Sequence, residues 1–203
     1  MNGDSEWVER VRRALADRPA DGIPETQCEI RAAVTLILRP PAAAGGTPEA
    51  LLVRRAEVPL DPWSGHVALP GGRWDSDDAD LLDTARREIL EETGLRLERE
   101  DHLGRLADIH PRSRHLPSIC VTPFVAWMAA HQEVRVNHEL TDHVWIPVSA
   151  LSDPVYRSTL VREAPSVREF PTVDYEGNVI WGLTLAILED FLAVLATAQE
   201  TDS

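Results

Sequence analysis

The sequence predicts an α/β fold in which helices pack on both faces of a β-sheet, as in an α/β/α sandwich. Strand-like apolar segments and amphipathic helical segments are interspersed along the chain, which is the pattern of layered α/β domains. A chain of 203 residues forms one large domain that buries roughly 70% of the surface of its unfolded state.

The first predicted elements are a short helix and two strands. Apolar residues at helical spacing predict an amphipathic helix near the N-terminus, and these are Trp7, Val8, Val11, Ala14 and Leu15. Residues 30–38 are almost entirely apolar and predict a strand. Residues 40–49 contain paired prolines and paired glycines, so they predict a loop that leads to a second strand over 50–55.

Residues 79–93 predict a helix with one apolar and one acidic side. Its apolar stripe recurs at three- and four-residue spacing and comprises Leu81, Leu82, Ala85 and Ile89. Carboxylates near a helix start cap free N–H groups and favour the helix dipole, and the candidates are Asp77, Asp78 and Asp80. Gly94 stands where a left-handed residue ends a helix.

The later elements complete the layered pattern. Strands are predicted over 104–109, 119–128 and 143–147, a turn or short helix over 148–151, and a long helix over 183–197. The chain divides into an N-terminal helix and lead-in (1–27), the main domain (28–197) and a disordered polar tail (198–203).

The acidic side of the 79–93 helix holds a cluster of three glutamates. Glu88, Glu91 and Glu92 lie within an arc of roughly 100° and about one turn of helix. Like charges at this spacing repel each other and destabilise a helix, so a bound cation explains them better than a solvated surface does. Oxygen ligands suit Mg²⁺, and the small residues of the preceding 69–72 loop let backbone approach a ligand or metal closely.

Residues 87–95 carry a family resemblance. They match every specified position in the second half of the Nudix box, R-E-U-x-E-E-x-G-U with U aliphatic: Arg87, Glu88, Ile89, Glu91, Glu92, Gly94 and Leu95. The first half departs, because the box expects Gly and Glu where the chain has Arg73 and Ala79. Gly72 lies one residue too early, so the loop before the helix is one residue longer than the common form.

This longer loop resembles the coenzyme A pyrophosphatase branch of the Nudix family. The branch pattern G-G-x-x-D-x-x-D-x5-T-A-x-R-E is matched without a gap by Gly71, Gly72, Asp75, Asp78, Thr84, Ala85, Arg87 and Glu88. Residues 51–72 are similar to the upstream signature of the branch, with three departures: Ala56 for Ser, Trp63 for His and His66 for Gln. Segments 121–125 and 180–184 extend the resemblance over about residues 30 to 195.

The resemblance implies a mixed central sheet and a metal-dependent pyrophosphohydrolase. Cleavage of coenzyme A or its thioesters would yield 4′-phosphopantetheine, or its acyl form, and adenosine 3′,5′-bisphosphate. The upstream departures leave open a second function, hydrolysis of another nucleoside diphosphate derivative or of an oxidised nucleoside triphosphate. A third alternative is a non-catalytic ligand-sensing module. The intact glutamate cluster disfavours it, because a sensor does not need repelling carboxylates.

The resemblance also implies the catalytic roles. Glu91 and Glu92 would bind Mg²⁺ or Mn²⁺ directly, Glu88 would be a further ligand or the base that activates water, and a carbonyl of the loop at Gly72 would complete the shell. Arg87 is expected to orient a carboxylate through a bidentate pair. Glu139, six residues before Trp145, is a further candidate ligand or base, with Asp142 as the spare candidate.

Four residues are candidates for substrate contact. Arg54 and Arg55 alternate along a strand, so at most one of them reaches the diphosphate, and Arg55 is selected. Trp63 either stacks on a nucleobase or packs into the core. His66 lies in the same region, and Gly71 lets backbone approach the ligand.

The net charge and the cysteine content limit the possible binding partners and the cellular compartment. The net charge of −14 argues against binding of nucleic acid or acidic membranes, but not against a small anionic substrate accompanied by metal ions. There is no run of 18 apolar residues. Cys28 and Cys120 are far apart in sequence, which favours two free thiols in a reducing cytoplasm. The partner is expected to be a small coenzyme A-like nucleotide, and the sequence leaves a homodimer open.

Overall fold

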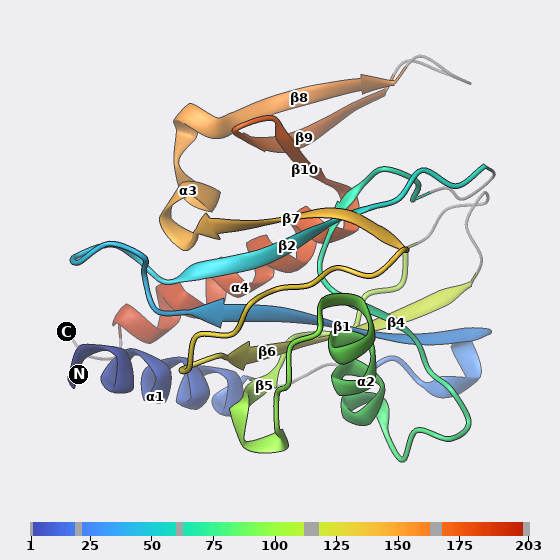
Figure 1. The fold of residues 1–203 in the computed structure, drawn as a ribbon, viewed down its shortest axis with the longest axis horizontal. Helices are drawn as coiled ribbons and strands as arrows, with labels where there is room; N and C mark the ends of the chain where they lie inside the picture. The colour runs from blue at the N-terminus through green and yellow to red at the C-terminus, as the bar shows by residue number, and fades with distance from the viewer. Residues whose placement is uncertain (1, 19–21, 60–62, 112–117, 163–167, 201–203) are drawn as a thin grey trace.

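The computed structural model describes residues 2–18, 22–59, 63–111, 118–162 and 168–200, and helices lie on both faces of a mixed sheet (Figure 1). The strands of this sheet are β1 (Ile30–Arg39), β2 (Glu49–Arg55), β3 (Val67–Ala68), β4 (Gly71–Arg73), β5 (His102–Arg105), β6 (Ile119–Trp127) and β7 (Leu140–Pro147). Their order is β3-β2-β1-β6-β5, with β4 paired to β1 and β7 paired to β2. Only β1 and β6 run parallel. The predicted α/β/α sandwich with a mixed central sheet is confirmed.

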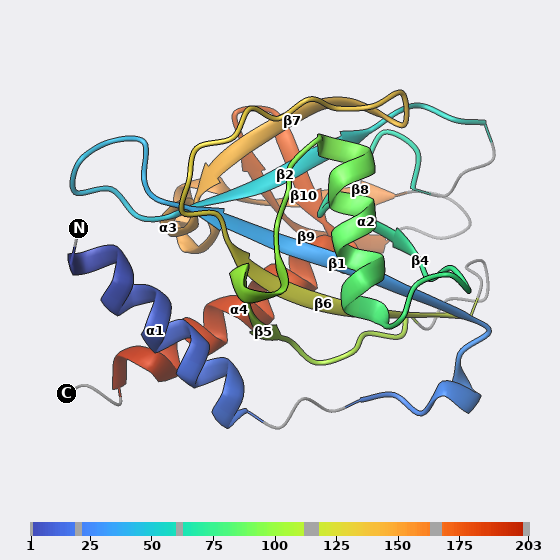
Figure 2. The same ribbon diagram turned by 60° about the horizontal axis from the view of Figure 1, so that its bottom comes forward.

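The described part of the chain contains four α-helices around the sheet: α1 (Asn2–Asp17), α2 (Leu81–Thr93), α3 (Val148–Ser152) and α4 (Gly182–Glu200). Helix α2 packs on β1 and β4, whereas α1 and α4 pack against each other beneath the opposite face (Figure 2). Helix α4 continues through the first three residues of the predicted disordered tail, and residues 201–203 lie outside the described residues. Residues 148–151, predicted as a turn or short helix, belong to α3. No described helix is both long and apolar enough to span a membrane.

Alternation along β1 supplies apolar side chains to both faces of the sheet. Ile37 packs with Ile89 of α2 on one face. Leu36 and Leu38 point to the other face and join a larger cluster that includes Phe191 of α4. Because both faces are covered, β1 is apolar along nearly its whole length, as expected for a central strand.

Two predicted strand boundaries needed correction, and two short strands were not predicted. Strand β5 ends at Arg105, and only Ile109 of the remaining predicted segment pairs, in an isolated bridge to Val121. Strand β7 starts at Leu140, three residues before the predicted strand. Short strand β4 overlaps the predicted 69–72 loop and places the paired glycines against β1, and short strand β3 lies just before that loop.

A second, three-stranded antiparallel sheet was not predicted from the sequence. It consists of β8 (Arg157–Arg162), β9 (Arg168–Tyr175) and β10 (Asn178–Trp181), in the order β10-β9-β8, and it stands apart from the main sheet in Figure 1. Strand β8 is mostly exposed and carries no apolar alternation that marks one face as buried. The Pro171 in β9 further weakens the strand signal.

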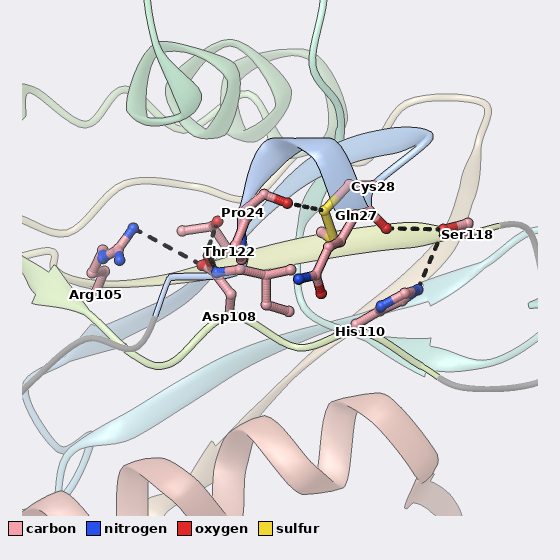
Figure 3. Close-up of a disulfide and its surroundings, with 10 residues drawn as sticks. Pro24, Gln27, Cys28, Arg105, Asp108, His110, Ser118 and Thr122 are labelled. Carbon is pink, nitrogen blue, oxygen red and sulfur yellow. Dashed lines mark hydrogen bonds and ion pairs between the residues drawn. A yellow bond between two sulfur atoms is a disulfide. The ribbon is translucent and has the colours of Figure 1, made fainter.

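The two cysteines form a disulfide, so the expectation of two free thiols is wrong. Cys28 precedes β1 and Cys120 lies in β6, and the parallel pairing of these strands brings their Cα atoms to 5.6 Å. Sequence separation had concealed this proximity. The cytoplasmic expectation loses the support that it drew from free thiols. Polar contacts also hold the chain around the disulfide. Thr122 Oγ1 donates a hydrogen bond to Asp108 Oδ1 at 2.7 Å (Figure 3).

We expect reduction of the Cys28–Cys120 disulfide to lower the free energy of unfolding by about 2–4 kcal/mol, because the cross-link constrains a long loop of the unfolded chain. The two cysteines are 92 residues apart. Urea denaturation with and without a thiol reductant measures the loss. The Cys28→Ser variant is the control, and its stability should not respond to the reductant. An unchanged urea midpoint for the reduced wild-type protein would contradict the prediction.

Candidate active site

Local capping fixes the position of α2 and therefore of its glutamates. The side chain of Asp80 accepts a hydrogen bond from the Asp83 N–H at 2.8 Å and caps the first turn. Gly94 ends the helix with a φ of 71°, and its N–H donates to the Leu90 carbonyl at 3.0 Å. Because Ile89 is fully buried against the sheet, the acidic side of α2 lies at the edge of the contact between the helix and the sheet.

Glu92 is the most deeply placed carboxylate of the predicted cluster. Only 4% of the residue is exposed, and one carboxylate oxygen accepts a hydrogen bond from the Gly71 N–H at 2.9 Å. Burial raises the pKa of Glu92 to about 7, the hydrogen bond from Gly71 opposes this shift, and the negative Glu88 adds to it. A buried carboxylate whose charged form is destabilised in this way is suited to bind a cation.

Glu88 lies against the second glycine of the loop. A Cβ atom added to Gly72 would meet the Glu88 carboxyl carbon at 2.4 Å, so the carboxylate occupies the space that a side chain would need. Burial raises the pKa of Glu88, and the hydrogen bond from Arg87 opposes that shift. The absence of a side chain at Gly72 therefore allows a carboxylate to lie beside a backbone segment with its own carbonyl oxygen.

Arg87 organises the acidic residues around it. Its Nε and Nη2 donate to the two carboxylate oxygens of Asp78 at 3.0 and 2.9 Å, which is a bidentate pair. Its Nη1 donates to Glu88 at 2.8 Å and to Glu91 at 3.2 Å. The expected bidentate pair is thus present, but with Asp78. The side chain of Glu91 is 54% exposed and lies toward solvent.

Asp78 is a candidate helix cap and a position of the branch pattern in the sequence, and in the structure it is the main partner of Arg87. It also accepts hydrogen bonds from Thr84 Oγ1 at 2.8 Å and from the Asp75 N–H at 3.1 Å. The hydrogen bonds from Arg87 hold the pKa of Asp78 well below its usual range, although burial opposes this. The sequence carried a signal for this arrangement, because Asp75, Asp78 and Thr84 are three of the eight positions that match the branch pattern.

Glu139 and Arg55 come to the same site from the opposite side. The Ala56 N–H donates to the Glu139 carbonyl at 2.8 Å, which places this exposed loop residue beside the end of β2. Glu139 interacts electrostatically with Glu88 and Glu92, and Arg55 interacts with Glu92. Arg54 points away and donates to Asn178 Oδ1 at 2.8 Å. The spare candidate, Asp142, is exposed in β7 opposite Arg54.

His66 and Trp63 lie at the margin of this region. The His66 ring contacts the Trp181 ring edge-on, with centroids 4.8 Å apart. The Trp63 carbonyl accepts a hydrogen bond from the His66 N–H at 3.2 Å, and the Trp63 side chain is half-buried. Sequence reasoning placed His66 in this region but had no signal for its ring partner, which follows 115 residues later in the chain.

The residues present fit a divalent cation. Two half-buried or buried carboxylates, Glu88 and Glu92, face a glycine loop whose backbone is accessible, and carboxylate and carbonyl oxygens are the ligands of Mg²⁺ and Mn²⁺. Within the described ranges, no three His, Cys, Asp or Glu side chains form a ready-made ligand group. Arg87 holds Glu91 and Glu88 in their present positions.

The matching family model and the similar proteins all point to one family. A model described as "NUDIX domain" matches residues 29–167. A protein from Yersinia pestis (strain Pestoides F), described as "Uncharacterized Nudix hydrolase NudL", is 37% identical over 144 residues, which is 70% of this chain and 69% of that protein. The protein of the same description from Yersinia pseudotuberculosis serotype O:1b is equally similar over the same shares.

Solved structures show the same fold at lower sequence identity. A MutT/nudix family protein from Enterococcus faecalis is 18% identical with a TM-score of 0.58, covering 100% of this chain and 76% of that one. An Ap4A hydrolase from C. elegans is 20% identical with a TM-score of 0.52, covering 83% of this chain and 98% of that one. At these identities the likeness concerns the fold alone.

Proposed function

The chain belongs to the Nudix hydrolase family and is a pyrophosphatase, and from this premise we propose that it cleaves the diphosphate bond of coenzyme A or its thioesters. The products would be 4′-phosphopantetheine, or its acyl form, and adenosine 3′,5′-bisphosphate. Nudix hydrolases generally use divalent metal ions, and for this chain we propose Mg²⁺ or Mn²⁺.

The observation that carries the substrate proposal is the lengthened loop before α2. Its residues fit the coenzyme A pyrophosphatase pattern, and three of them form one hydrogen-bonded unit with Arg87: Asp75, Asp78 and Thr84. The pattern therefore corresponds to a physical arrangement that fixes the arginine next to Glu88. Because three positions upstream of the loop depart from the branch signature, the substrate test also includes other nucleoside diphosphate derivatives.

The glutamates and glycines define the proposed metal-binding side of the site. Glu92, Glu88 and a carbonyl of the loop at Gly72 would hold the cation, with Glu91 at its exposed margin. The bound cation would neutralise the diphosphate oxygens and make a hydroxide available near neutral pH. Arg87 keeps Glu88 and Glu91 oriented, and Asp78 keeps Arg87 in place.

Residues on the other side of the site would accept the proton and bind the substrate. Glu88 is engaged by Arg87 at 2.8 Å, which suits a fixed ligand. Glu139 is exposed beside Glu88 and Glu92, and we assign to it the acceptance of the proton from the attacking water. Arg55 lies close enough to affect Glu92 and would bind a diphosphate oxygen. We propose that the Gly71 backbone lies close to the substrate. Its missing side chain leaves room for β1, because an added Cβ would lie 2.2 Å from the Ala33 carbonyl oxygen.

A substrate panel tests the proposed function. The purified protein is incubated with Mg²⁺ and coenzyme A, NADH, ADP-ribose, diadenosine polyphosphates or 8-oxo-dGTP, and the products are separated by chromatography. We expect the highest kcat/KM for coenzyme A, with adenosine 3′,5′-bisphosphate as one product. A higher kcat/KM for any other compound would replace coenzyme A by that substrate. Hydrolysis of none, with Mg²⁺ or Mn²⁺, would favour the ligand-sensing alternative.

We expect millimolar Mg²⁺ to raise the thermal midpoint of the protein, because the cation binds the folded site and relieves repulsion among its carboxylates. The gain in stability is about 2.7 kcal/mol when Mg²⁺ is present at 100 times its Kd. Differential scanning fluorimetry measures the midpoint. NaCl at equal ionic strength is the control, because screening alone stabilises a chain with a net charge of −14. Equal shifts with NaCl and Mg²⁺ would contradict a specific site.

A further inference from the structure

Three aromatic rings from separate parts of the chain contact one another beside the candidate active site. Trp181, at the end of β10, contacts the His66 ring at 4.8 Å and the Phe170 ring at 5.5 Å between centroids. All three residues are half-buried, so part of each remains accessible to solvent. We call these three residues the aromatic wall.

Hydrogen bonds fix the aromatic wall to the main sheet. Arg54 in β2 donates to Asn178 at the start of β10, at 2.8 Å. Thr184, in the first turn of α4, donates to the Val67 carbonyl of β3 at 3.2 Å. In Figure 1, β10 and the start of α4 lie beside the segment that leads into β3. The position of Trp181 is therefore set from both sides.

The register of β2 and β3 connects the aromatic wall to the diphosphate side of the site. Arg54 is paired with Val67, so the next residue pair along the strands is Arg55 and His66, and the Arg55 N–H donates to the His66 carbonyl at 3.0 Å. Directly opposed residues of antiparallel strands have their side chains on the same face of the sheet. Arg55 in turn interacts with Glu92. Glu92, Arg55 and His66 thus follow one another across one face.

We propose that the aromatic wall binds the purine base of the nucleotide substrate by stacking, while Arg55 binds the adjacent diphosphate. Stacking on an aromatic side chain is the sequence-tolerant way in which proteins hold a base, and Trp offers the largest surface. Phe170 in β9 and Trp181 in β10 lie beyond residues 29–167, where the family model matches, whereas His66 lies within them. Two of the three rings of the proposed base-binding surface therefore come from outside the matched region. This inference rests on the proposed function, because it places the adenine of coenzyme A at the wall and the pantetheine arm on the other side of the diphosphate.

The test compares the binding of the two reaction products. Isothermal titration calorimetry with Mg²⁺ measures the Kd of adenosine 3′,5′-bisphosphate and of 4′-phosphopantetheine for the wild-type protein and Trp181→Leu. Leucine keeps an apolar side chain in the cluster but removes the ring. We expect the Kd of the bisphosphate to rise about tenfold or more, and that of phosphopantetheine to stay within twofold. Trp181→Phe should restore most of the bisphosphate affinity.

Matched controls separate a local from a structural effect. Tyr175→Leu removes a ring from the Tyr156–Tyr175 pair on the same small sheet, and it should leave both Kd values unchanged. Thermal midpoints of all variants report folding. An unchanged bisphosphate Kd in folded Trp181→Leu, or a weakened phosphopantetheine Kd, would overturn the proposal.

Failure of the inference can be distinguished from failure of the proposed function. If the wild-type protein does not hydrolyse coenzyme A, the proposed substrate is wrong, whatever the Trp181 variants do. The wall is then tested with AMP, which contains the base without the pantetheine arm. A tenfold loss of AMP affinity in Trp181→Leu would support base stacking for another purine nucleotide, and an unchanged affinity would overturn it.

Discussion

Glu92→Gln is expected to lower turnover of the best panel substrate by about 10²–10³-fold or more, the loss typical when one group that stabilises transition-state charge is removed. The substituted amide keeps the size of the side chain and can still accept the Gly71 N–H bond that Glu92 accepts at 2.9 Å. The negative charge that would hold the cation is lost. Steady-state kinetics at saturating Mg²⁺ measures the effect, and near-normal turnover would rule out Glu92 as a ligand.

The same substitution should stabilise the metal-free protein at high pH. Burial raises the pKa of Glu92 from 4.5 to about 7 in the folded state. Between these values the folded protein keeps a proton that the unfolded chain has lost, so stability falls as pH rises. Above pH 7 the full loss is about 3 kcal/mol. In EDTA we therefore expect Glu92→Gln to have the higher urea midpoint at pH 8, and no advantage at pH 4.

A matched control for both effects is Glu133→Gln. Glu133 is exposed and pairs with Arg135 at 2.8 Å, so its charge is solvated. This variant should keep normal turnover and a wild-type dependence of stability on pH. A variant of Glu92 that lost activity without gaining stability at pH 8 would show that the buried carboxylate is not under electrostatic strain.

Gly71→Ala is expected to lower the free energy of unfolding by about 3 kcal/mol or more, because overpacking and backbone strain each cost about 1–3 kcal/mol. A Cβ at this position would lie 2.2 Å from the Ala33 carbonyl oxygen and 2.5 Å from the Val34 Cα. Both atoms belong to the backbone of β1, so β4 would have to move. The φ of 148° is also unfavourable for alanine. Urea denaturation followed by circular dichroism measures the loss.

Gly177→Ala is the control for strain without crowding. Gly177 has a φ of 82°, and nothing lies within 4 Å of the Cβ that alanine would add. Its cost should stay at about 1–2 kcal/mol, the penalty for a left-handed residue. Similar losses for the two variants would show that the contact between β4 and β1 is looser than the distances indicate. Turnover should fall in Gly71→Ala alone, because only this glycine binds Glu92.

The acidic helix was predictable because its signals are local. The cap at Asp80, the stop at Gly94 and the shared side of Glu88, Glu91 and Glu92 all follow from contacts three or four residues apart. The helix was predicted over 79–93 and forms over Leu81–Thr93. Residue spacing therefore fixes which carboxylates share a side before any tertiary contact forms.

The division of labour among those carboxylates was not predictable in the same way. The sequence analysis gave Glu91 and Glu92 the same role as direct metal ligands, yet Glu92 is buried against Gly71 and Glu91 is exposed. Asp78 looked like one of several caps until its bidentate pair with Arg87 was seen. Helix periodicity places Glu92 on the same side as the buried Ala85 and Ile89, and the packing of α2 on β1 and β4 sets how deeply that side is buried.

The sequence by itself determined the family, the fold class and the presence of a carboxylate cluster, because helix periodicity and motif spacing are properties of neighbouring residues. Only the tertiary structure decided that Cys28 bonds to Cys120, that Arg54 donates to Asn178, and that Trp181 lies against His66. These contacts join residues that are distant in sequence. The register of β1 with β6 brings the two cysteines together, whereas the other two contacts form where β10, from the separate three-stranded sheet, packs against β2 and β3 once the apolar faces are buried.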